Sequence, residues 1–228
     1  MTLGNGILVG TVTSLEDPLA LGRVRVKLPV LADAEGNWAQ IASLMAGKNR
    51  GTLFRPEVGD AVLVACEMGD INRLYVLGAL WNQTDTPPAM GDPAKDNDLR
   101  VIRSRSGHVL KFNDKAGAET IELIDKDEKR KLIIKCADKT VELRAEAEGD
   151  TITVAAPSGT VKVTAAQKVA IEASKGDISV TASAGKISLK AMTIEVEATG
   201  ELTLKGGTVA LKATAGITTI AGSIVKIN

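Results

Sequence analysis

The sequence predicts an all-β protein, in which an N-terminal OB-fold barrel precedes a C-terminal trimeric, intertwined β-helix shaped as a three-sided prism. Three observations support this class. Short apolar stretches separated by turn residues fill the first third of the chain, and paired aliphatic residues recur through the second half. Aromatic residues make up only 2% of the chain. Because aromatic side chains bury the largest areas, a core without them must be narrow and built from Val, Ile, Leu and Ala.

Five strands are expected in the N-terminal part. They are rich in Val, Leu and Ile, and several alternate apolar with polar residues, which is the period of a half-buried strand. Glycines and prolines separate them, and no helical pattern interrupts. Five short strands in this length suit a small closed barrel of the OB type. The expected strands cover residues 7–15, 22–30, 38–43, 60–67 and 73–80.

The domain boundaries follow from composition. Residues 84–98 are rich in Pro, Gly and Asp and are typical of a linker. We therefore expect the barrel domain at residues 1–83, a linker and connecting strand at 84–118, and the repeat β-helix at 119–228.

The repeat consists of two aliphatic residues that flank one residue, recurring every 7–9 residues with Gly, Ala, Ser and Lys between the pairs. Such a period is the signature of a solenoid-type array with one strand and one turn per repeat. Strand side chains alternate, so both members of a pair point inward and the residue between them faces water. The predicted axial core is Ile152, Val154, Val161, Val163, Val169, Ile171, Ile178, Val180, Ile187, Leu189, Ile194, Val196, Leu202, Leu204, Val209 and Leu211.

A single chain of such repeats is expected to be unstable. Two inward side chains per repeat return less free energy than the backbone entropy lost by ordering about eight residues. Bare strand edges also remain, and these favour pairing with other strands. Three chains wound about a common axis solve both problems. A hexapeptide β-helix is disfavoured by the longer period, and a calcium-binding nonapeptide solenoid by the absence of its Gly-Asp motif.

Chemistry-bearing residues are sparse. The chain has 28 basic and 28 acidic residues, which argues against a nucleic-acid partner. The single histidine, His108, could combine with Ser106 and Asp114 only within one strand-like segment, where neighbouring side chains point to opposite faces. We therefore expect no enzymatic activity, no catalytic residue, no metal site and no cofactor. The role of His108 stays open.

Several phrases in order resemble one protein family. GRVRVKLPVL at residues 22–31, RPEVGDAVLVACEMGDINRLYVLGALWN at 55–82 and RSRSGHVLKFND at 103–114 precede the aliphatic repeat. Together they resemble the baseplate spike proteins of contractile phage tails and related injection systems, of the gpV-like and VgrG-like kind. The large hub region that precedes the OB-fold in VgrG-type spikes is absent from this sequence.

The resemblance implies a homotrimeric central spike that docks on a separate hub protein through its OB-fold and pierces the target envelope mechanically. It also implies a separate PAAR-type tip protein, expected to dock on Ile217, Ile220, Ile224, Ile227 and Asn228. The N-terminus lacks the features of a signal peptide, so we expect synthesis in the cytoplasm and incorporation into a phage tail or injection particle. A trimeric adhesin that binds surface glycans, or an enzyme on a β-solenoid, are the alternatives.

Overall fold

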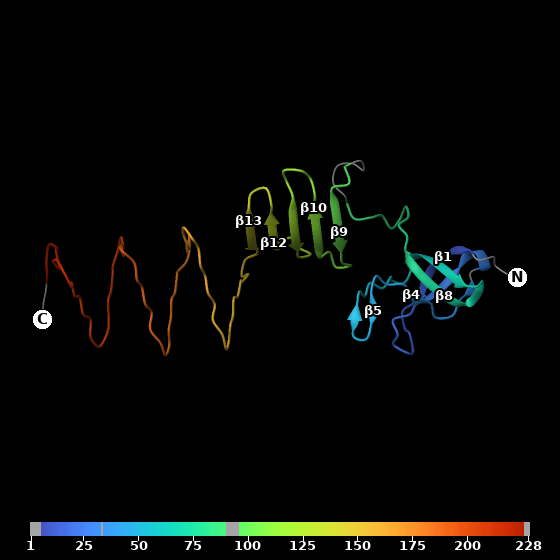
Figure 1. Ribbon diagram of the computed structural model, residues 1–228, viewed down its shortest axis with the longest axis horizontal. Coiled ribbons are helices and arrows are strands. Elements are labelled where there is room, and N and C mark those ends of the chain that lie inside the picture. The colour runs from blue at the N-terminus through green and yellow to red at the C-terminus, as the bar shows by residue number, and fades with distance from the viewer. Residues whose placement is uncertain (1–5, 33, 90–95, 226–228) are drawn as a thin grey trace. The chain divides into compact units, whose positions relative to one another are not determined.

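The computed structural model describes residues 6–32, 34–89 and 96–225, and within them every regular element is a strand except one 3-10 turn. The chain divides into two units, Met1–Pro157 and Ser158–Asn228. The first unit contains a barrel and a separate five-stranded sheet, and the second contains the later repeats (Figure 1). The prediction of an all-β chain is confirmed.

The barrel is built on a six-stranded sheet with the order β3-β2-β1-β7-β8-β4. Strand β4 runs parallel to β8, and the other neighbours are antiparallel. An antiparallel bridge between Val24 and Ala39 joins the β2 side to the β4 side, which closes the sheet on itself. The strands are β1 Ile7–Ser14, β2 Arg25–Leu28, β3 Ala34–Glu35, β4 Gln40–Ile41, β7 Ala61–Glu67 and β8 Asp70–Ala79; the 3-10 turn is Pro29–Leu31.

The barrel core contains only aliphatic residues. Every side chain in it is at most 2% exposed, and the aromatic residues Phe54 and Trp81 are mostly exposed. At Gly10 of β1, a Cβ atom would lie 2.3 Å from Cγ1 of Val26, so the absence of a side chain lets β1 pass close to β2. The narrow core predicted from composition is confirmed for this unit. Its members are Val12, Val24, Val26, Leu28, Ala39, Val62, Val64, Leu74 and Val76.

All five barrel strands expected from the sequence are present, each within a few residues of its expected bounds. Three short strands were not expected. Strand β3 pairs with β2 at the edge of the barrel sheet. Strands β5 (Ala46–Gly47) and β6 (Arg50–Gly51) form a two-stranded hairpin that belongs to neither larger sheet. The sequence of the hairpin offers only two Gly and one Asn as turn signals, and two residues per strand are too few for an alternation to be visible.

The second sheet is an antiparallel meander with the order β13-β12-β11-β10-β9. It begins at Leu99, inside the segment expected to hold only a linker and a connecting strand. The expected boundary between residues 118 and 119 lies in the turn between two paired strands, β10 and β11. The strands are β9 Leu99–Arg103, β10 Val109–Asn113, β11 Thr120–Ile124, β12 Arg130–Lys135 and β13 Thr140–Ala145.

Residues 151–225 form no strand pairs within the single chain, and every one of them is exposed. They run as straight segments separated by bends, visible as a zigzag from yellow to red in Figure 1. The predicted prism is therefore not present in one chain alone. The physical reason is that each segment has backbone donors and acceptors on both edges and no neighbouring strand in this chain to satisfy them.

One loop of the barrel is fixed by a nearly buried ion pair. The Asp17 carboxylate, 3% exposed, bonds the Arg23 guanidinium at 2.7 Å and accepts backbone N–H bonds from Leu19, Leu21 and Arg23. The hydrogen bond from Arg23 is the main reason why the pKa of Asp17 lies well below its usual range. The loop thereby holds Leu19 and Leu21 in water, where both are mostly exposed.

We expect Asp17→Asn to lower the Tm of the barrel by several degrees at neutral pH, because an amide cannot accept all of these bonds. Because the pKa of Asp17 is lower in the folded state, its ionised carboxylate stabilises the fold at pH values above the pKa of about 4 that Asp has in the unfolded chain. This stabilisation is lost as the pH falls below that value. The difference in Tm should therefore shrink below about pH 4. Thermal unfolding followed by circular dichroism checks this, with Glu16→Gln, an exposed neighbour, as the control. Equal Tm values for both variants at pH 7 would contradict it.

Candidate functional site

The five-stranded sheet has one continuous apolar face. Its register aligns two rows of side chains across the strands, because residues paired directly opposite share a face. Both members of the aliphatic pairs at residues 121/123, 132/134 and 141/143 lie on this face, as the predicted alternation requires. The first row is Ile102, Leu110, Leu123, Leu132 and Leu143, and the second is Phe112, Ile121, Ile134 and Val141.

No segment among the described residues covers this apolar face. Leu110 and Ile134 are half-buried, and its other seven large side chains range from 37% exposed at Leu132 to 70% at Val141. Monomeric proteins rarely leave so large a contiguous apolar surface in water, and such surfaces mark sites of association. The face is therefore the candidate functional site.

The opposite face of the same sheet is complete in itself. Lys111 and Glu122 pair across strands at 2.9 Å, and Lys135 and Glu142 at 2.6 Å. Hydrogen bonds from Lys135 and then Arg144 lower the pKa of Glu142, which keeps its charge available for these pairs. Under these side chains Ile133 is only 8% exposed. The charged face is suited to contact with solvent and needs no partner, whereas the apolar face needs a partner to cover it.

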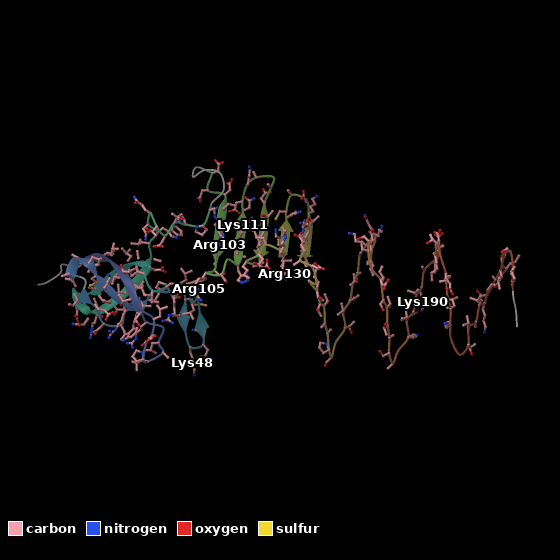
Figure 2. All side chains as sticks on the ribbon, turned by 180° about the vertical axis from the view of Figure 1, so that it is seen from behind. Lys48, Arg103, Arg105, Lys111, Arg130 and Lys190 are labelled. Carbon is pink, nitrogen blue, oxygen red and sulfur yellow. The ribbon has the colours of Figure 1, made fainter. Side chains whose placement is uncertain are left out.

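The repeats continue the same pattern in six-residue extended segments between bends. Aliphatic residues occupy positions two and four, and from residue 151 to residue 213 this holds in every segment. The sixteen residues predicted as the axial core all lie at these positions. Their exposure ranges from 48% at Ile152 to 76% at Ile171, so in one chain they are not buried. Figure 2 shows side chains on both sides of a single layer of backbone, as at Lys190.

A third residue of each segment lies on the same side as the aliphatic pair, and the sequence alone did not predict it. Position six alternates onto the same face as positions two and four. It is always small, and only the bends of the structure reveal the register that aligns these residues. They are Ala156, Ala165, Ala173, Ala182, Ala191, Ala198, Gly206, Ala213 and Gly222.

The pattern changes at the end of the described chain. The sequence pairs Ile217 with Thr219, but the structure places Ile217 directly after a bend and Ile220 at position four. Ile217 is 90% exposed and Ile224, also directly after a bend, is 76% exposed. All eight earlier segments have Thr, Lys, Asp or Glu at this position. Of the residues predicted to dock a tip protein, Ile227 and Asn228 lie outside the described residues.

The residues considered for catalysis are not assembled. His108 Nδ1 accepts the backbone N–H of Lys126 at 3.2 Å, and the His108 backbone N–H donates to Ser104 Oγ at 3.0 Å. Ser106 Oγ contacts Ser104 Oγ at 3.3 Å, and Asp114 pairs with Arg100 beyond the far end of β10. His108 therefore ties two turns together. Among residues 6–32, 34–89 and 96–225, no three His, Cys, Asp or Glu side chains are grouped as a metal site would require.

The comparisons with known proteins agree with this architecture. Residues 8–81 match the family described as the Type VI secretion system/phage-baseplate injector OB domain. These residues are the barrel. The chain resembles the gpV-type and VgrG-type baseplate spike proteins.

The similar spike proteins are much longer than this chain. Type VI secretion system spike protein VgrG3 of Vibrio cholerae is 31% identical over 110 residues, which are 45% of this chain and 11% of that protein. VgrG1a of Pseudomonas aeruginosa is 30% identical over 90 residues, 37% of this chain and 14% of that protein. The actin cross-linking toxin VgrG1 of V. cholerae is 28% identical over 110 residues. The chain thus spans about a tenth of the length of such relatives. No helix among the described residues is long and apolar enough to cross a membrane.

We expect Ile178→Asp to prevent assembly, because it places a carboxylate from every chain against an apolar core, where an unpaired charge is very costly. Ser179→Asp changes the adjacent, outward residue and should leave assembly intact. Sedimentation velocity at micromolar concentration distinguishes the two. Partial recovery of Ile178→Asp near pH 4, where the new carboxyl protonates, would support the reason given. If both variants assemble equally well, the predicted facing is wrong.

Proposed function

We propose that this chain is a structural, homotrimeric spike component of a contractile injection machine. The observation that carries the proposal is the uncovered apolar face of the five-stranded sheet, together with the same alternation of large aliphatic residues along the exposed segments of the repeats. Identical copies are suitable partners because each copy carries the same uncovered rows of apolar side chains, and these rows can cover one another. The match to the injector OB domain and the similarity to VgrG spike proteins support a contractile injection machine as the assembly to which the chain belongs.

Segment length favours three chains over four. Six extended residues span about 20 Å, so a triangle with such sides has its centre about 6 Å from each face. Two packed sheets lie about 10 Å apart, so the side chains of one sheet fill a layer about 5 Å deep. This depth is close to the distance of about 6 Å from each face of the triangle to its centre. Three faces fill such a prism with aliphatic side chains alone. Four faces of the same length would each lie about 10 Å from the centre and would leave an open channel about 5 Å in radius. Residues 151–225 contain no aromatic side chain that could fill it.

Within the proposed spike, the barrel docks on a separate hub protein and the β-helix pierces the target envelope. The barrel is suited to docking because its core is complete without the repeats, so its outer surface is free for partners. A prism with charged outer faces and an aliphatic axis is a stiff rod without a binding pocket for a small substrate. We propose a mechanical role without catalysis.

We further propose that a PAAR-type tip protein docks at residues 217–228. The supporting observation is the exposure of Ile217 and Ile224 at the position where earlier segments carry polar residues. Apolar side chains in a row of otherwise polar ones are typical of a docking surface.

For the trimer, we expect sedimentation equilibrium of the full chain to give three times the 23.8 kDa of one chain at micromolar concentration. Burial of the aliphatic rows in the assembly should also protect the backbone amides of residues 151–225 from hydrogen exchange. Ile178→Asp is the control that should lose both properties. A stable monomer with folded repeats would overturn the proposal, and a stable tetramer would overturn the argument from segment length.

For the tip, we expect the double variant Ile217→Asp/Ile224→Asp to weaken binding of a PAAR-type protein from the same genome at least tenfold. Two carboxylates would be buried unpaired in the contact. Thr208→Asp, at the same position of the preceding segment, is the matched control and should bind normally. Pull-down from purified trimers measures both. Normal binding by the double variant would show that the tip docks elsewhere.

A further inference from the structure

The β5–β6 hairpin, together with the residues at its base, stands apart from the barrel and carries four large apolar side chains in water. We call residues 43–54 the arm. In Figure 1 its strand β5 lies away from the barrel strands β1, β4 and β8, and in Figure 2 Lys48 marks its tip. Leu44 is 96% exposed and Leu53 80%, while Met45 and Phe54 are also mostly exposed. More than half of the surface of each of these four apolar side chains is thus exposed to solvent.

The arm is nevertheless a well-defined element. The Thr52 backbone N–H donates to the Met45 carbonyl at 3.0 Å, and Ser43 Oγ donates to the Thr52 carbonyl at 2.7 Å. Gly51 has a φ of +146°, and a Cβ there would lie 2.3 Å from the Met45 carbonyl oxygen. An isolated two-stranded hairpin is marginally stable in water and normally needs a surface to pack against. The bonds at its base therefore indicate an arm shaped for a contact.

The base of the arm lies at the beginning of the apolar face. Phe54 lines a hollow together with Ile102, Leu110 and Leu123 of the first apolar row. An ion pair at 3.1 Å between Glu57 and Arg105 joins the segment after the arm to the turn between β9 and β10. Strand β9 is the edge of its sheet, so the axial core of a trimer would end there with Ile102 in water. The arm of the same chain borders this hollow and leaves it open.

We propose that the arm of each protomer crosses to the β9 edge of a neighbouring copy, so that three arms together close the barrel-side end of the axial core. This inference rests on the proposed homotrimer. Three copies of the face meet at one axis, and the elements beside its first strand must then converge. Leu53 and Phe54 supply the apolar surface that covers Ile102 and Leu110 of the neighbour. The occupant of the hollow is a second copy of this chain.

Cysteine cross-linking of the full chain tests the contact. In a Cys66→Ala/Cys136→Ser background, Leu53→Cys combined with Ile102→Cys should give covalent trimers after mild oxidation, reversed by reductant. Three links can close a ring only if each joins two different chains. Met68→Cys combined with Ile102→Cys is the control, because Met68 is 93% exposed on the turn between β7 and β8, and should give no covalent trimer.

The outcomes separate the arm from the trimer. Links within one chain, or no links, in a sample that sediments as a trimer would overturn the arm contact and leave the homotrimer standing; a separate protein would then be the better occupant. A monomeric sample would overturn both proposals. As a second measurement, Leu53→Asp/Phe54→Asp should lower the Tm of the assembled trimer by several degrees. An unchanged Tm would show that the arm is free in solution and contradict the proposal.

Discussion

The alternation of side chains along a strand is the constraint on which this structure depends. From residue 151 to residue 213 it places two large aliphatic residues and one small residue of each segment on one side, and mainly polar residues on the other. The described part of the chain provides no second layer to cover the aliphatic side. Because the hydrophobic contribution grows with the apolar area removed from water, this side contributes little until a partner buries it. In the proposed homotrimer, folding of the repeats and association of the chains are one process.

The barrel obeys a different rule, since it closes on itself. The bridge between Val24 and Ala39 removes the open edge that leaves the repeats incomplete, and nine aliphatic side chains fill the interior. In the proposed spike, the barrel is complete in one chain and docks on the hub. The repeats of the proposed spike supply a stiff shaft only when three chains are present.

The five-stranded sheet combines a property of the barrel with a property of the repeats. Its hydrogen bonds are made within one chain, as in the barrel, yet its apolar face is left for partners, as in the repeats. Cross-strand pairs such as Lys111 with Glu122 fix which side faces water. In the proposed homotrimer, the sheet can therefore set the orientation of the apolar rows before the repeats assemble, and the arm closes the proposed core at its β9 end.

The sequence by itself determined the class of this protein. The low aromatic content, the five alternating stretches and the aliphatic pairs specify a narrow all-β barrel and a one-sided repeat, because composition and period act through local geometry. The tertiary structure decided what depends on contacts between distant residues. These are the joining of residues 99–113 to the second sheet, the six-residue register that puts Ala156 and its equivalents on the side of the aliphatic pairs, and the position of Ile217 on the opposite side. The arm also belongs here, since two-residue strands have no period, and only the hydrogen bonds of Ser43 and Thr52 define it.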